Sequence, residues 1–204
     1  MIKKESKMSE KNSSTITKTE KSRQKAHTMT RSQRLAIDGI LAALAVVLGF
    51  VSIRIGNIMK ISLEDLPIIF AALLFGPADG AAVALVGIFL YQLFSYGLTV
   101  TTPLWILPFV VAGLIIGAFA KKANFNNSNK QILILFLAAE IMIWAMNSFA
   151  IYADSKIYGY YYPTIVSGML LIRLVTAVIK GIVLGLISPA VLKSLSRITH
   201  NGRR

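Results

Sequence analysis

The stretch QILILFLAAEIMIWAMNSFAIY, residues 131–152, runs for 22 residues with a single charged side chain, Glu140. Because a helix rises about 1.5 Å per residue and the hydrocarbon core of a bilayer is about 30 Å thick, this run is long enough to cross a membrane. The whole chain shares the bias, since 55% of its 204 residues are hydrophobic and 15% are charged. Soluble domains are about 45–50% apolar and about 25% charged. The sequence therefore predicts an integral membrane protein.

Five further apolar segments flank this stretch, separated by turns rich in Gly, Pro and Asn. The second of the six is short for a membrane span. Together they predict an all-α fold, a bundle of six transmembrane helices in a membrane domain that covers residues 35–195. The predicted spans are residues 35–55, 61–75, 79–96, 103–120, 131–152 and 164–192.

The two ends of the chain are polar and basic. Residues 1–34 hold 10 of the 22 Lys and Arg residues and few apolar ones, so we expect a disordered tail rather than a secretory signal. Residues 196–204 form a second basic tail. With six spans, 17 basic residues lie on the side of the termini and 3 on the opposite side. The positive-inside rule then places both termini in the cytoplasm of a multi-pass cell-membrane protein.

Several classes of function are excluded by what the chain lacks. It has no cysteine, and its two histidines, His27 and His200, lie in the tails. No phosphate-binding P-loop and no group of metal ligands with suitable spacing occurs. The basic charge is confined largely to the tails, which argues against a nucleic-acid-binding domain. We therefore predict no catalytic residues and no metal site.

Three charged residues, Glu140, Arg173 and Lys180, fall deep inside the predicted spans, where charge is costly and indicates function or pairing. Asp38, Glu64 and Asp65 lie nearer the span ends. Counting residues from the cytoplasmic ends places Glu140 about 14 Å deep and Lys180 about 18 Å deep. This similarity predicts a structural ion pair between Glu140 and Lys180 that joins the last two helices. Arg173 lies about 28 Å deep, and no carboxylate within a span matches its depth.

Trp144 and Asn147 lie on the same helix face as Glu140, because the three are spaced i, i+4 and i+7. They belong to the outer half of their helix, level with Arg173. An aromatic plane, an amide and a guanidinium at one depth suit a flat or carboxylate-bearing small molecule. An interfacial tryptophan with an interhelical amide hydrogen bond explains the same residues without a ligand.

Small residues crowd one part of the first span, where Gly39, Ala42 and Ala43 are close in sequence. Small residues spaced four apart let membrane helices approach closely. This pattern fits packing within the chain and docking onto a partner subunit equally well.

The order of several short motifs resembles the substrate-binding S components of energy-coupling factor (ECF) vitamin transporters. The motifs are Ser52-Ile53-Arg54 with Lys60-Ile61, then Leu66-Pro67, and Leu74-Phe75-Gly76-Pro77 followed by Gly80. The small-residue run Ala42–Ala45 and the later residues Asn147, Tyr158-Gly159 and Arg173 to Lys180 agree with this family. The likeness extends over about residues 35–195.

The resemblance implies a subunit that captures a vitamin from outside and associates with a membrane coupling protein and two cytoplasmic ATPase subunits. ATP would be used by those partners, with no cofactor in this chain. The coupling protein would dock on Gly39, Ala42 and Ala43. The substrate-binding residues implied by the resemblance are Arg54, Asn57, Trp105, Trp144, Asn147 and Arg173.

The motifs are most similar to the folate group of these S components. Residues 99–107, TVTTPLWIL, depart from that group's aromatic proline-glycine turn, so pantothenate and other carboxylate-bearing vitamins stay open. Two other classes of function also compete. One is a small membrane enzyme acting on lipid, with Glu140 or Asp38 as its acid–base group; the other is an assembly subunit without a ligand.

Overall fold

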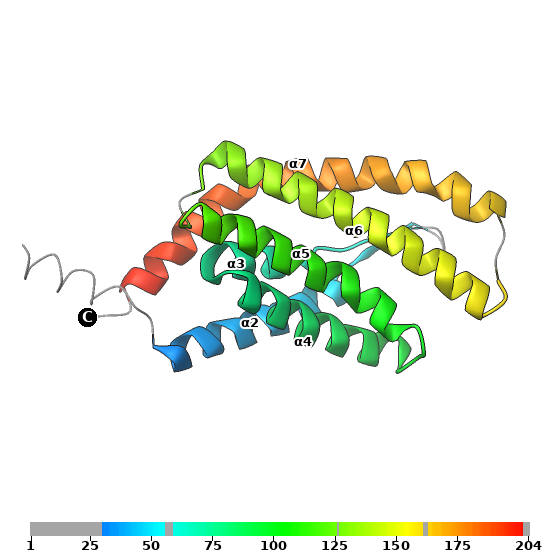
Figure 1. The fold of residues 1–204 in the computed structure, drawn as a ribbon, viewed down its shortest axis with the longest axis horizontal. Coiled ribbons are helices and arrows are strands. Elements are labelled where there is room, and N and C mark those ends of the chain that lie inside the picture. The colour runs from blue at the N-terminus through cyan, green and yellow to red at the C-terminus, as the bar shows by residue number, and fades with distance from the viewer. Residues whose placement is uncertain (1–29, 56–58, 126, 161–162, 202–204) are drawn as a thin grey trace, which may run out of the picture.

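The structure, a computed structural model, describes residues 30–55, 59–125, 127–160 and 163–201. In these ranges the chain forms six helices and one antiparallel hairpin of two short strands (Figure 1). The elements are α2 (Arg31–Phe50), β1 (Ile53–Ile55), β2 (Met59–Ile61), α3 (Asp65–Phe75), α4 (Pro77–Tyr96), α5 (Thr102–Lys122), α6 (Asn129–Ile157) and α7 (Pro163–Asn201).

Five of the described helices are long and apolar enough to cross a bilayer: α2, α4, α5, α6 and residues 170–194 of α7. The predicted all-α membrane bundle is thereby confirmed. The helix α3 differs, because its 11 residues span only about 16 Å. It lies inside the bundle, where it contacts α2, α4, α5 and α7, and most of its side chains are buried.

The two ends of the bundle are built differently (Figure 1). The start of α2, the α5–α6 connection and the C-terminal part of α7 lie at one end, which we call the termini end. The α4–α5 and α6–α7 connections lie at the other, which we call the loop end. The helix α7 bends near its C-terminal end (Figure 1), where Pro189 lies inside the helix and removes a backbone donor.

The hairpin corrects the predicted end of the first span. Helix α2 ends at Phe50, and Ile53 of β1 pairs with Ile61 of β2, so residues 51–55 are not helical. The second span was also predicted to begin at Ile61, whereas α3 begins at Asp65. The run Ile53-Arg54-Ile55 alternates β-branched with charged residues, a pattern that favours a strand over a helix end.

The first described helix begins four residues before the predicted membrane domain, which starts at residue 35. Helix α2 begins at Arg31, because the Thr30 side chain accepts a hydrogen bond from the Gln33 backbone while the Gln33 side chain accepts one from the Thr30 backbone. This reciprocal capping box stabilises a helix start. Residues 1–29 of the predicted tail lie outside the described residues. At the other end, α7 continues to Asn201, past the predicted boundary at residue 195.

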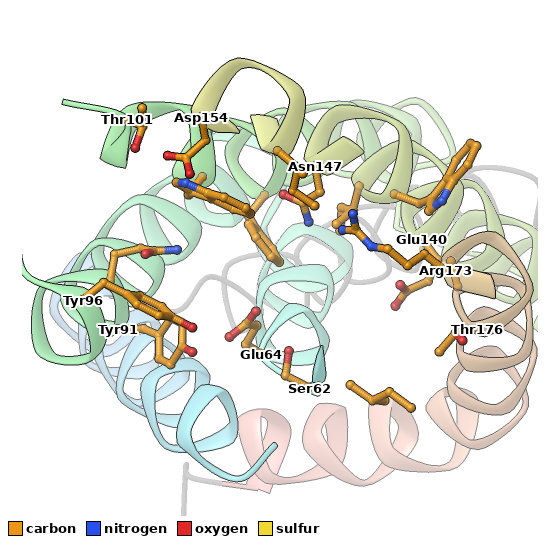
Figure 2. A pocket seen from close by; sticks show the side chains of 18 of the residues that line it. Ser62, Glu64, Tyr91, Tyr96, Thr101, Glu140, Asn147, Asp154, Arg173 and Thr176 are labelled. Atoms are coloured by element: carbon orange, nitrogen blue, oxygen red, sulfur yellow. The ribbon is translucent and has the colours of Figure 1, made fainter. Parts of the chain in front are cut away.

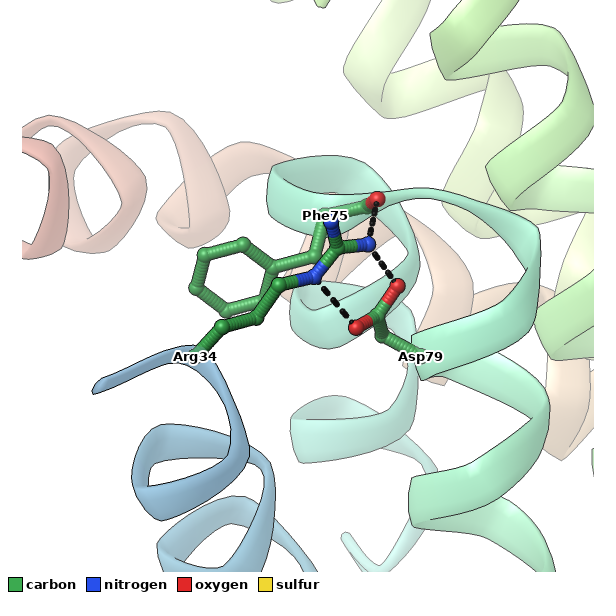
Figure 3. Close-up of polar contacts among 3 residues, drawn as sticks. All are labelled: Arg34, Phe75 and Asp79. Atoms are coloured by element: carbon green, nitrogen blue, oxygen red, sulfur yellow. Dashed lines mark hydrogen bonds and ion pairs between the residues drawn. The ribbon is translucent and has the colours of Figure 1, made fainter. Parts of the chain in front are cut away.

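An arginine clamp fixes the start of α2 to the corner between α3 and α4 (Figure 3). Arg34 Nε donates to Asp79 Oδ1 at 2.5 Å, and Arg34 Nη2 donates to the Phe75 carbonyl at 2.6 Å and also to the second Asp79 oxygen. The guanidinium also lies 5.7 Å from the centre of the Phe75 ring. A two-pronged charged contact of this kind sets orientation as well as distance.

Glycines allow α5 to approach the same corner closely. A methyl group built on Gly117 would lie 2.4 Å from the Pro77 nitrogen, whereas one built on Gly39 of α2 meets nothing within 4 Å. The first contact is far inside van der Waals range and involves backbone, so it cannot be relieved by a rotamer change.

We therefore expect Gly117→Ala to lower the free energy of unfolding by about 1–3 kcal/mol and Gly39→Ala to leave it unchanged or raise it slightly. Both glycines lie in helix interiors, where Ala is more stable than Gly by about 0.5–1 kcal/mol. This gain is the same in the two variants, so the difference between them measures the steric contact. Thermal unfolding in detergent measures both variants. Equal midpoints would contradict the close approach of α5 to the corner.

Candidate functional site

A cavity of about 780 Å³ opens between the helices in the half of the bundle nearer the loop end (Figure 2). Its size falls within the range of about 300–1,000 Å³ typical of small-molecule sites. It is lined by residues from α4, the α4–α5 connection, α5, α6 and α7, together with Ile61 at the end of β2 and the following Ser62 and Glu64.

Four of the six predicted substrate-binding residues line this one cavity: Trp105, Trp144, Asn147 and Arg173. They come from three helices and lie up to 68 positions apart in the sequence, so the fold brings them together. Arg54 lies in β1, where only the backbone is described. Asn57 lies outside the described residues.

The helices α6 and α7 contribute two matching rows of cavity residues. On α6 these include Glu140, Trp144 and Asn147, and on α7 they include Arg173 and Lys180. The two helices run antiparallel and side by side (Figure 1). Glu140 contacts Lys180. Asn147 follows Glu140 by seven residues, and Arg173 precedes Lys180 by seven on the antiparallel α7, so both lie nearer the loop end by the same helix rise and share a level, as the sequence predicts.

The guanidinium of Arg173 is one of the cations that line the cavity. It points into the open space from α7 (Figure 2), and among the described residues none forms a hydrogen bond or an ion pair with it. Asn147 Oδ1 is likewise buried with no hydrogen-bond partner in the described part of the chain. Buried polar groups are normally satisfied, so the guanidinium indicates a missing polar partner in the cavity.

Lys180, by contrast, is fully paired. Its Nζ lies 2.9 Å from Glu140 Oε2, 3.0 Å from Asp65 Oδ1 and 3.2 Å from the Ser62 carbonyl. The contact with Glu140 is the ion pair that depth counting predicts. We call Glu140, Lys180 and Asp65 the ion cluster.

The role of Asp65 was not predicted from the sequence, which places it near the end of a span. Asp65 is fully buried because α3 is short and begins inside the bundle, after the hairpin and the extended segment Ser62–Leu63. A carboxylate in the first turn of a helix is also stabilised by the helix dipole. No periodicity in the sequence signals such an internal helix start.

Aromatic side chains form the wall opposite α7. Tyr91 and Tyr96 of α4 meet edge to face with ring centres 6.2 Å apart, and both line the cavity across from Arg173 (Figure 2). Trp105 of α5 extends this wall. The Trp144 indole N–H donates to the Leu170 carbonyl at 3.2 Å, which holds the ring against α7.

The rim at the loop end carries a tyrosine–carboxylate contact. The Tyr160 hydroxyl donates to Asp154, a residue that lines the cavity. Partial burial of the hydroxyl, together with this hydrogen bond, raises the pKa of Tyr160 to about 12. Tyr160 therefore stays a neutral donor at physiological pH and joins the start of the α6–α7 connection to α6.

The three small residues predicted for docking do not share one environment. Gly39 and Ala43 lie on the exposed face of α2. Ala42 is buried and packs against Gly87 of α4, where an added methyl would lie 3.1 Å from the Ala42 carbonyl oxygen. Ala42 therefore packs within the chain, and docking of a partner on this helix stays a prediction.

Residues 33–192 match the model of the family described as "ECF transporter, substrate-specific component". The chain belongs to this family. Its fold also matches solved S components: "the S component of a bacterial ECF transporter" is 26% identical with a TM-score of 0.58, covering 83% of this chain and 98% of that one. "The S-component for biotin from an ECF-type ABC transporter" is 21% identical with a TM-score of 0.60, covering 83% and 95%. No curated protein sequence matches this chain.

Membership fixes the class of function. The protein is an S component, the substrate-binding membrane subunit of an ECF transporter, and not an enzyme. S components associate with a membrane coupling protein and with ATPase subunits, and the ATP is used by those partners. The rival of a lipid-modifying membrane enzyme is thereby excluded.

Proposed function

We propose that this S component captures a vitamin that carries both a carboxylate and a flat ring. The carboxylate binds the Arg173 guanidinium, and the ring lies between Trp144 and the aromatic wall of Trp105 and Tyr91. The observation that carries this proposal is the Arg173 guanidinium, which lines the cavity and has no hydrogen-bond or ion-pair partner among the residues that the structure describes. Arginine presents a planar fork of donors that matches a carboxylate.

The cavity faces outward in this proposal. It lies in the half of the bundle away from the termini, and the 17-to-3 excess of basic residues on the side of the termini favours a cytoplasmic position for that side. Substrate then enters from outside through the rim formed by Thr99, Asp154 and Tyr158. Both termini lie in the cytoplasm, and the membrane is the cell membrane.

Among carboxylate-bearing vitamins, folate is the first candidate, since the motifs around the hairpin and the α3–α4 corner are most similar to the folate group. Pantothenate is the second, because Arg173 suits its carboxylate equally well. The likeness to the biotin S component shows the fold alone at 21% identity, so biotin serves as a third test ligand.

The partners in this proposal are a membrane coupling protein and two cytoplasmic ATPase subunits. We propose the exposed face of α2 around Gly39 and Ala43 as the docking surface for the coupling protein, because small residues permit a close helix approach. This surface is separate from the cavity, so substrate capture and docking can be tested independently.

The proposed function is tested by native mass spectrometry of the detergent-purified protein, followed by equilibrium dialysis with folate, pantothenate and biotin. We expect one co-purifying carboxylate-bearing vitamin, and tight binding of that vitamin when it is added back. Recovery of a vitamin without a carboxylate would contradict the role of Arg173. Binding of none of the three, together with recovery of lipid only, would contradict vitamin capture altogether.

A further inference from the structure

We propose that Glu140 is a specificity-determining residue, whose free carboxylate oxygen accepts a hydrogen bond from an N–H or O–H group of the ligand. The selected ligand then carries its carboxylate at one end and a hydrogen-bond donor at the other. This inference rests on the proposed function and deepens it.

Every N–H donor of Lys180 already has an acceptor within the protein. The ammonium group has three hydrogens, and it has three acceptors at 2.9, 3.0 and 3.2 Å: Glu140 Oε2, Asp65 Oδ1 and the Ser62 carbonyl. Lys180 therefore has no hydrogen left for a ligand, although it lines the cavity. The polar group that the cluster still offers is an acceptor.

Two oxygens of the cluster have no hydrogen-bond partner in the described part of the chain: Glu140 Oε1 and Asp65 Oδ2. Glu140 lines the cavity and is 2% exposed, whereas Asp65 is 0% exposed and does not contribute to the cavity lining. An orphaned carboxylate oxygen is costly in a low-dielectric interior. Of the two residues, only Glu140 lines the cavity, so a ligand there can approach its carboxyl group and not that of Asp65.

The position of Glu140 sets the shape of the ligand. Arg173 and Lys180 are seven residues apart on α7, so the ion cluster lies about 10 Å deeper along the bundle than the free guanidinium. The cluster already surrounds the one ammonium with two carboxyl groups, so it offers no unpaired positive charge to a ligand carboxylate. The ligand therefore enters donor end first and leaves its own carboxylate beside Arg173.

A purely structural explanation competes with this one. The carboxyl groups of Asp65 and Glu140 also contact each other, and a proton shared between them would satisfy both free oxygens without a ligand. In that case, substitutions of Glu140 and of Asp65 change the Kd of the ligand equally. If the proposal is correct, substitution of Glu140 changes Kd more, because only Glu140 contacts the ligand.

The test compares Glu140→Gln with Asp65→Asn, which each remove one of the two charges around Lys180. The probe is whichever of folate, pantothenate and biotin the wild-type protein binds most tightly, and its Kd is measured by equilibrium dialysis in detergent. We expect Glu140→Gln to raise Kd about tenfold or more, because hydrogen bonds to charged groups are about twice as strong as neutral ones. We expect Asp65→Asn to change Kd less than threefold.

A ligand analogue keeps the test decisive if either variant folds poorly. The same vitamin with its ring N–H or terminal O–H groups methylated should bind the wild-type protein at least about tenfold more weakly than the parent. Equal shifts in Kd for the two variants, or an unchanged Kd for the methylated analogue, would overturn the role of Glu140 and leave vitamin capture intact. Absence of binding by all three parent vitamins would instead overturn the proposed function.

Discussion

Replacing Arg173 with methionine is expected to weaken capture of the vitamin about a hundredfold or more, since two charged hydrogen bonds of about 1.5–3 kcal/mol each are lost. The protein should fold at least as well as the wild type. The guanidinium has no partner among the described residues, so its removal breaks no contact in the free protein and relieves the cost of an unpaired buried charge. Equilibrium dialysis and thermal unfolding in detergent measure the two effects separately.

Two further variants make this result specific. Lys156→Met removes a cation from the loop end of α6, at a residue that does not line the cavity. The Kd of this variant should stay within about twofold of the wild type. Arg173→Lys keeps the charge but not the bidentate fork, so it should recover only part of the affinity. An unchanged Kd in Arg173→Met would refute the carboxylate site.

The facing rows on α6 and α7 were predictable from the sequence. Glu140, Trp144 and Asn147 share a helix face by spacing alone, and the antiparallel order of consecutive spans fixes which residues of α7 lie level with them. The Glu140–Lys180 contact at 2.9 Å and the shared cavity of Trp144, Asn147 and Arg173 follow from those two rules. Residue counting is sufficient here because both helices are long and run without a break between these residues.

The other side of the cavity was not predictable in the same way. Asp65 reaches the ion cluster only because α3 starts inside the bundle, and Tyr91 faces the cavity through the packing of α4, which no spacing rule marks. Helix starts, however, were signalled: Thr30 with Gln33 and Ser128 with Gln131 both form capping boxes, and this pattern is visible in the sequence.

The second large effect is expected at the other functional surface. Ala43→Leu should reduce vitamin uptake by cells about tenfold or more and leave the Kd of the purified S component unchanged. Ala43 is exposed on α2, and the neighbouring Gly39 has open space around it. A leucine at this position keeps a coupling-protein helix from the close approach that small residues allow. The cavity is unaffected, because none of its lining residues belongs to α2.

The matched control is Ala138→Leu, which adds the same side chain at an exposed position of the lipid-spanning part of α6. Co-purification with the coupling protein and ATPase subunits should be lost in Ala43→Leu and retained in Ala138→Leu. Uptake should follow co-purification, because captured vitamin cannot be released inward without the partners that use ATP. If both variants take up vitamin equally well, the small face of α2 is not the docking surface, and the coupling protein must contact a different face of the bundle.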